Sequence, residues 1–226
     1  MDRRHFLRKG LIAAGSAAIL APATTFGRTT ALRTDGKNTF SLNLLTDDAS
    51  KSIRLVDAFM KRRDIGTDAI TVEAFPLPGH HAGDIAYLQN GLLYNFYDGT
   101  DALALELKSM ARAHDFPRAL TNPILLRYRV GTSSGKASTA EIFRDGVPVL
   151  TLPLGSDLRS HRIEGTKGHV TVSIRNGGIQ VVDASCRHKT CMELGHTHRA
   201  GDSLACIPAR VSIRLDGQST LDGISL

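Results

Sequence analysis

The three cysteines of this 226-residue chain are its strongest constraint, because Cys186, Cys191 and Cys206 all fall within 21 consecutive residues together with three of the nine histidines. Cys186 and Cys191 lie five residues apart, so a turn can bring them together. Cys206 ends a short apolar run that is typical of a strand. We therefore expect the three sulfurs to converge at one end of a small sheet.

Three kinds of chemistry fit this cluster, and the spacing alone leaves them open. In an oxidising compartment, two of the thiols should form a disulfide and one should stay free, and each of the three pairings is possible. A zinc or iron–sulfur site would combine the three thiolates with His188 or His196, since soft ligands suit these metals. A redox-active thiol pair is the third alternative, although its spacing is looser than the C-x-x-C that commonly lowers a thiol pKa.

Enzymatic chemistry has weaker support. Asp183, Glu193 and Asp202 flank the cysteine loops, but solvated loop carboxylates are far commoner than catalytic pairs. A nucleophile built from Cys191 with His188 or His196 would tend to be trapped as a disulfide in an oxidising compartment. The chain shows no nucleophile elbow, P-loop or dinucleotide fingerprint. We therefore assign no catalytic residues and expect no enzymatic activity.

One iron–sulfur arrangement can be compared residue by residue. Cys186 and His188 are similar to the first loop of a Rieske site, in which each of two loops gives one cysteine and one histidine. The second loop should then offer a histidine three residues after Cys206, where this chain has Ala209. A standard cluster would need His196 or His198 of the first loop as a substitute.

The amino terminus carries an export signal. Residues 1–23 combine the paired arginines Arg3-Arg4, an uncharged apolar run from Gly10 to Leu20 and a small-residue cleavage site at Ala21-Pro22-Ala23. This segment resembles the twin-arginine (Tat) signal, which exports folded proteins. It is too short for a membrane-spanning helix, which needs about 20 apolar residues. We expect a periplasmic or otherwise extracytoplasmic protein that meets a membrane only through an uncleaved signal.

The net charge argues against a nucleic-acid partner. The whole chain carries +6, but the charged residues of the first nine contribute +3, which leaves +3 for the rest. This remainder contains no basic block and no tryptophan. A small charge spread over the chain lacks the clustered basic patch that nucleic-acid binding requires. We expect a protein partner in the cell envelope instead.

After a polar linker over residues 24–37, residues 38–131 alternate between strand and helix patterns and predict a mixed α+β domain. One helix should follow the cap residues at 46–48 and end near residues 62–63, and a second should span 101–114. The strands expected here cover 40–45, 70–75, a strand or hairpin within 84–97, and 124–130. His80 and His81 lie between them, and we expect both in a surface loop.

Residues 138–217 have a different pattern, with short alternating segments, glycine turns and no predicted helix. The Asn176-Gly177 pair is a strong hairpin signal, and Asp145-Gly146 marks another turn. Strands spaced this closely predict a small antiparallel β-barrel or sandwich. The whole chain is therefore expected to be an α+β protein with two domains.

Several motifs occur in a fixed order within this second part. They comprise Asp145-Gly146, the Ile163-Glu164-Gly165 step, the loop matched by Cys186, Lys189, Cys191 and Gly195, and the strand start matched by Gly201, Cys206 and Pro208. In this order they resemble the stand-alone NusG domain II family, a compact all-β module. The chain departs from the family at Arg187-His188, where Pro-Asp is frequent, and at Ala209, where Asn is frequent.

The resemblance implies a fold and a cysteine pattern, without an assigned reaction. Together with the signal, it indicates an exported binding or accessory protein of the cell envelope. We expect it to serve a redox or transport complex and to hold no cofactor. The alternatives are an electron-transfer or metal-binding protein with zinc or an iron–sulfur cluster, and a thiol oxidoreductase. These alternatives differ in their expected metal content and in the number of free thiols.

Overall fold

The computed structural model of the chain describes residues 39–65, 70–131 and 135–217. The predicted signal peptide, residues 1–23, and the predicted linker, residues 24–37, lie outside this range and remain predictions. Within the described range, no helix combines the length and the apolar character that a membrane crossing requires.

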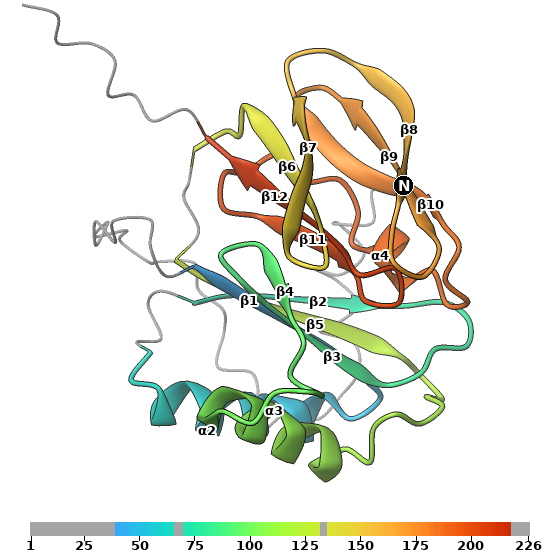
Figure 1. The fold of residues 1–226 in the computed structure, drawn as a ribbon. Helices are drawn as coiled ribbons and strands as arrows, with labels where there is room; N and C mark the ends of the chain where they lie inside the picture. Colours follow the sequence, from blue (N-terminus) through green and yellow to red (C-terminus); the bar gives the residue numbers. More distant parts are fainter. Residues whose placement is uncertain (1–38, 66–69, 132–134, 218–226) are drawn as a thin grey trace, which may run out of the picture. The chain divides into compact units, whose positions relative to one another are not determined.

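A five-stranded sheet forms the centre of the amino-terminal part (Figure 1). Its strands are β1 (Phe40–Thr46), β2 (Ile70–Pro76), β3 (Asp84–Gln89), β4 (Leu92–Tyr94) and β5 (Ile124–Val130). They lie in the order β2-β5-β1-β3-β4, and each neighbouring pair is antiparallel. The strands β1 and β2 therefore run parallel to each other with β5 between them. These strands match those predicted for residues 40–130.

Helices α2 (Ala49–Arg62) and α3 (Ala102–Ala113) lie next to each other along one face of this sheet (Figure 1). Each begins where an aspartate caps it. The side chains of Asp48 and Asp101 both accept a backbone N–H from three residues later, at 2.9 Å. Such caps satisfy backbone donors that the first helical turn leaves without a partner. The sequence pattern placed both helices correctly.

The central strand β1 is buried on both of its faces. Leu42 and Leu44 are fully buried in one hydrophobic cluster, which they share with residues of the two helices. Leu45 belongs instead to a second cluster, made mostly of residues beyond 140. Ser41 and Asn43 are also buried, at 6% and 7% exposure. Because neighbouring side chains of a strand point to opposite faces, the second face of the sheet is partly polar.

The carboxy-terminal part contains two further antiparallel sheets. One is three-stranded, in the order β10-β9-β8, and the other is four-stranded, in the order β11-β12-β6-β7. Their strands are β6 (Thr139–Arg144), β7 (Val147–Pro153), β8 (Leu158–Glu164), β9 (His169–Arg175), β10 (Gly178–Ala184), β11 (Ser203–Cys206) and β12 (Val211–Asp216). Mostly antiparallel sheets beside two helices agree with the predicted α+β class. In the described residues no sheet closes into a barrel, so a barrel is not confirmed.

Two local features test the sequence patterns of this part. Asn176 and Gly177 both have positive φ, at 51° and 72°, as the predicted tight hairpin requires. The expectation that this part has no helix was wrong, because α4 (Thr190–Glu193) forms a single turn inside the cysteine loop. Four residues are too few to produce a helical period in a sequence.

A buried ion pair joins the polar face of the sheet to the carboxy-terminal part. Arg129 on β5 donates to Asp202 at 2.6 Å, and both side chains are only 6% exposed. Arg129 also donates to Glu73 on β2 at 2.7 Å. Nearby, Arg127 donates to the carbonyl of Leu194 at 3.0 Å. The two parts of the described chain are thus connected through charged groups away from solvent.

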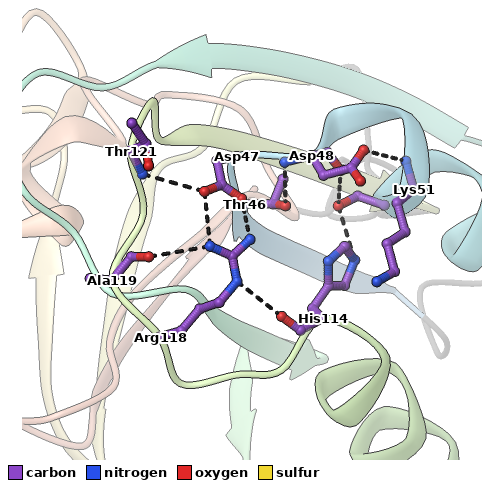
Figure 2. A network of polar contacts seen from close by, with 9 residues as sticks. Thr46, Asp47, Asp48, Lys51, His114, Arg118, Ala119 and Thr121 are labelled. Carbon is purple, nitrogen blue, oxygen red and sulfur yellow. Dashed lines mark hydrogen bonds and ion pairs between the residues drawn. The ribbon is translucent and has the colours of Figure 1, made fainter.

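A second polar network lies at the amino-terminal end of α2 (Figure 2). Arg118 forms an ion pair with Asp47 through both terminal nitrogens of its guanidinium group, and its Nε donates to the carbonyl of His114 at 3.2 Å. The Asp47 carboxylate also accepts the backbone N–H of Thr121 at 3.3 Å. Because β1 ends here, this network ties the loop that follows α3 to the sheet.

The same region contains a buried serine–histidine pair. The Oγ of Ser52 lies 3.1 Å from the Nε2 of His114, and the two residues are 0% and 3% exposed. The Ser52 hydroxyl also donates to the carbonyl of Asp48 at 2.9 Å. Since a carbonyl can only accept, that bond uses the single hydroxyl proton, and His114 must donate to Ser52. The pair is therefore structural, because His114 is not positioned as a base and solvent does not reach it.

We predict that Asp202→Ala lowers the free energy of unfolding by about 3–5 kcal/mol, because it leaves the buried guanidinium of Arg129 without its closest partner. Urea denaturation measures this change. The matched control is Glu164→Ala, which breaks an ion pair with Arg162 whose side chains are about 60% exposed and should leave the midpoint unchanged. If both variants lower the free energy of unfolding equally, the buried ion pair does not stabilise the fold more than an exposed one.

We also predict a pH dependence of stability that comes from His114. Burial, helped by the positive charge of Lys51, lowers the pKa of His114 below its ordinary value of 6.5. As pH falls below about 6.5, the unfolded chain takes up a proton that the folded chain does not, so the free energy of unfolding decreases. His114→Gln, which retains a donor for Ser52, should flatten this slope in urea titrations between pH 7 and pH 5.

The matched control for this measurement is His80→Gln, since His80 is exposed. This variant should show the slope of the parent chain. A parent chain whose stability does not change between pH 7 and pH 5, or a His114→Gln variant that keeps the full slope, would contradict the prediction.

Candidate functional site

The structure brings the three cysteines together. The sulfur atoms of Cys186, Cys191 and Cys206 all lie within 4.8 Å of one another, and each cysteine is a free thiol. Cys191 and Cys206 are buried, at 4% and 3% exposure, whereas Cys186 is half-buried. We call these three residues the thiol triad.

Two short loops hold the triad, and they share one local geometry. In each loop, the backbone N–H three residues after the cysteine contributes to lowering the pKa of that thiol: Lys189 for Cys186 and Ala209 for Cys206. Lys189 has a left-handed backbone, with φ at 49°, and so has Arg210 next to Ala209, at 54°. Few non-glycine residues adopt this conformation. The left-handed residues therefore turn each loop back on its own cysteine.

The three thiols differ in their acidity because they donate hydrogen bonds to one another. A hydrogen bond from Cys191 is the largest cause that lowers the pKa of Cys206 to about 6, and the Ala209 amide assists. The same bond, together with burial, raises the pKa of Cys191. Burial is the main cause that raises the pKa of Cys186. Negative charge in the triad is thus stabilised first on Cys206.

A loop of the amino-terminal part holds the first cysteine loop in place. The Nε2 of His81 lies 3.0 Å from the carbonyl of Pro78, and its Nδ1 lies 3.1 Å from the Oγ1 of Thr190. Since a carbonyl can only accept, Nε2 carries the proton, and the Thr190 hydroxyl donates to Nδ1. The Nδ1 of His188 lies 2.9 Å from the carbonyl of His80.

These contacts correct one prediction about the histidines. His80 is exposed as expected, but His81 is only 5% exposed, so it is not a surface residue. Its ring is buried because both of its nitrogens find partners when the cysteine loop packs against it. The partner residue Thr190 is 109 positions away in the sequence, which no local pattern can reveal.

A cavity of about 320 Å³ lies beside the triad. All three cysteines line it, together with His188, residues of β1, β3 and β5, and the loop at Pro117. Most of the lining is apolar and includes Leu45, Ala86, Leu125 and Leu194. One wall of the cavity is therefore the second face of the five-stranded sheet, which carries both polar and apolar residues. The cysteine loops form the other wall.

Two polar groups of the sheet also line this cavity. Asn43 is 7% exposed, and within the described residues its buried side-chain oxygen has no hydrogen-bond partner. Asp84 accepts a hydrogen bond from the hydroxyl of Tyr97 at 3.0 Å, and burial raises the pKa of its carboxyl. An unpartnered buried oxygen is costly. Asn43 and Asp84 thus add polar side chains to a largely apolar wall.

Other residues considered from the sequence lie outside the triad. His196 lies with its Nε2 at 2.9 Å from the carbonyl of Arg175. Asp202 is held in the ion pair with Arg129, and Asp183 pairs with Lys189 at 2.7 Å. Among the described residues, the three cysteine sulfurs are the metal-ligating atoms that converge here. Neither His188 nor His196 belongs to this group.

Sequence reasoning missed Asn43, His81 and Asp84. The sequence offers one signal for Asn43, which is a polar residue at the centre of an otherwise apolar strand. Polar residues are rarely buried without a partner, so such a position calls for an explanation. Nothing near His81 or Asp84 in the sequence distinguishes them from ordinary loop and strand-end residues. His81 contacts Thr190, 109 positions away, and Asp84 lines the cavity together with the distant cysteine loops.

Solved structures give a limited comparison. One similar structure is a DUF1312 family protein from Ruminococcus gnavus, with 28% identity and a TM-score of 0.31, covering 35% of this chain and 97% of that protein. A second is a DUF1312 family protein from Enterococcus faecalis, with 17% identity and a TM-score of 0.33, covering 36% and 98%. The Lin0431 protein from Listeria innocua has 19% identity and a TM-score of 0.33, covering 36% and 97%.

The family assignment rests on a different comparison. No curated protein matches this chain. The family model for NusG domain II matches residues 120–219. This range contains the whole of the predicted module over residues 138–217 and begins earlier, before strand β5. The chain therefore contains a NusG domain II over these residues, and this domain carries all three cysteines of the thiol triad.

Proposed function

We propose that this chain is a Tat-exported binding protein of the cell envelope, which takes a small and largely apolar ligand into the cavity beside the thiol triad. The observation that carries the proposal is the largely apolar cavity beside the triad, with the buried amide side chain of Asn43 in its lining. Export is supported by the sequence of residues 1–23, and an accessory role toward a protein partner in the envelope goes with it.

The cavity defines the class of ligand. Its volume of about 320 Å³ lies at the low end of the ~300–1,000 Å³ that ligand pockets usually span. Apolar walls favour a ligand that is mostly hydrocarbon, since burial of apolar surface stabilises the complex by about 25 cal/mol per Å². In this proposal the Asn43 side chain turns its oxygen toward the bound molecule. Because this oxygen can only accept, the ligand should present one N–H or O–H donor.

The triad has a separate role in this proposal. In an oxidising envelope, two of the three thiols form a disulfide that closes the loops, and the third stays free. All three sulfurs lie within 4.8 Å of one another, so any of the three pairings can form after small shifts of the side chains. We call this disulfide the staple. A disulfide between loops restricts the unfolded chain and thereby stabilises the folded one.

We predict that indole binds this chain more tightly than indene, its analogue without the N–H group, by roughly fivefold, because the N–H donates to Asn43 and such bonds contribute about 1 kcal/mol. In Asn43→Leu the preference should disappear, while indene should bind at least as well as before. Ligand-detected NMR titrations of the full chain measure all four dissociation constants.

Ala86→Leu provides a second variant, since Ala86 lines the cavity and is 8% exposed. It should weaken both ligands because the larger side chain fills part of the space. The matched control is Ala102→Leu on an exposed position of α3, which should change neither. The proposal fails if indole and indene bind equally to the parent chain, or if the Ala86→Leu variant binds both as the parent does.

We further predict the state of the cysteines in the exported protein. Thiol counting under denaturing conditions should find one free thiol in protein taken directly from the envelope and three after a reductant, because the chain has three cysteines. Three free thiols before reduction would contradict the staple. The ligand-binding proposal is independent of this result, since it depends on Asn43 and on the cavity walls.

A further inference from the structure

We propose that the reduced thiol triad is a site for one monovalent copper ion, Cu(I), held by the sulfurs of Cys186, Cys191 and Cys206. This goes beyond ligand binding in the cavity, because it concerns the sulfurs themselves. The carrying observation is that three sulfur atoms from two separate loops lie within 4.8 Å of one another. One small soft ion placed between them would contact all three at once.

The set of donors selects the metal. Thiolates are soft ligands that suit Cu(I), zinc and iron–sulfur clusters. Structural zinc sites almost always have four ligands, and iron–sulfur clusters use four cysteines or two cysteines with two histidines. In the described part of the chain, the triad has no fourth ligand, because neither His188 nor His196 joins the three sulfurs. Three sulfurs alone favour Cu(I), whose low charge and softness suit a three-coordinate thiolate site.

Backbone turns place the sulfurs of the two loops. Lys189, three residues after Cys186, has φ at 49°, and Arg210, four residues after Cys206, has φ at 54°. Cys191 lies in the single turn of α4, which begins directly after Lys189. Because these turns already bring the three sulfurs within 4.8 Å, binding of one ion needs little rearrangement.

The cavity supplies a path to the triad. All three cysteines line it, although Cys191 and Cys206 are buried from bulk solvent. An ion that enters beside Cys186, which is half-buried, can therefore reach the two buried sulfurs. The apolar walls would exclude water from the bound metal.

The binding step conserves electrons. Each sulfur that coordinates the ion gives up its thiol proton, and copper keeps its monovalent state. Exchange with an external disulfide, which takes up two electrons and two protons and leaves as two thiols, would convert two triad thiols to a disulfide and remove two of the three ligands. The site would thus bind copper in the reduced chain and release it when the staple forms. The proposal does not depend on the apolar ligand, since Asn43 is not one of the copper ligands.

The test is an anaerobic titration of the reduced full chain with Cu(I), in competition with the chromophoric chelator bicinchoninate. We expect one equivalent to bind, and X-ray absorption of the product should show a first shell of three sulfurs. Cys186→Ser, Cys191→Ser and Cys206→Ser should each weaken binding by more than the ~10–100-fold that loss of an outer-shell partner costs. Zinc should bind more weakly than Cu(I) to the same protein.

The matched control is His196→Gln, which removes a histidine of the same region that lies outside the triad and outside the cavity lining. This variant should bind Cu(I) within about twofold of the parent. The inference is overturned if a cysteine variant binds as the parent does, if a histidine variant loses binding, or if the absorption spectrum shows nitrogen or oxygen ligands. The spectrum of the parent decides the matter even where a cysteine variant does not fold.

Discussion

The buried ion pair between Arg129 and Asp202 carries much of the organisation of this protein. Both groups are only 6% exposed, and taking two charges out of water costs several kcal/mol per ion unless each is well paired. Arg129 meets this requirement with Asp202 on one side and Glu73 on the other. A misaligned sheet would leave the charges buried without partners, so the pair specifies how the two parts of the described chain meet.

This arrangement also explains why a cavity lies beside the thiol triad. The second face of the five-stranded sheet alternates buried polar and apolar residues and does not pack as a continuous apolar layer. Arg127 and Arg129 make their contacts toward one end of this face, with Leu194 and Asp202. Asn43 and Leu45 face the remaining space, which the cysteine loops cover without filling.

Contacts within the carboxy-terminal part and contacts from the amino-terminal part both hold the cysteine loops, so the triad is a preorganised site. Within the NusG domain II, the left-handed residues Lys189 and Arg210 turn the two loops. From the other part, His81 and the carbonyl of His80 contact Thr190 and His188. A thiol site that is preorganised in this way needs little rearrangement to bind a ligand or to form a disulfide.

The sequence by itself determined the secondary structure and the location of the site, because these depend on signals within a few residues. Alternation placed the strands, Asp48 and Asp101 marked where the helices begin, and the spacing of the cysteines with the surrounding motifs indicated the NusG domain II. The one-turn helix α4 and the burial of His81 were missed, since neither leaves a periodic pattern. Only the tertiary structure decided that Asn43, His81 and Asp84 belong to the same site as the triad. These residues are brought to it by packing between segments roughly 100 residues apart, and the free energy of such packing depends on complementary charge and shape that no local pattern contains.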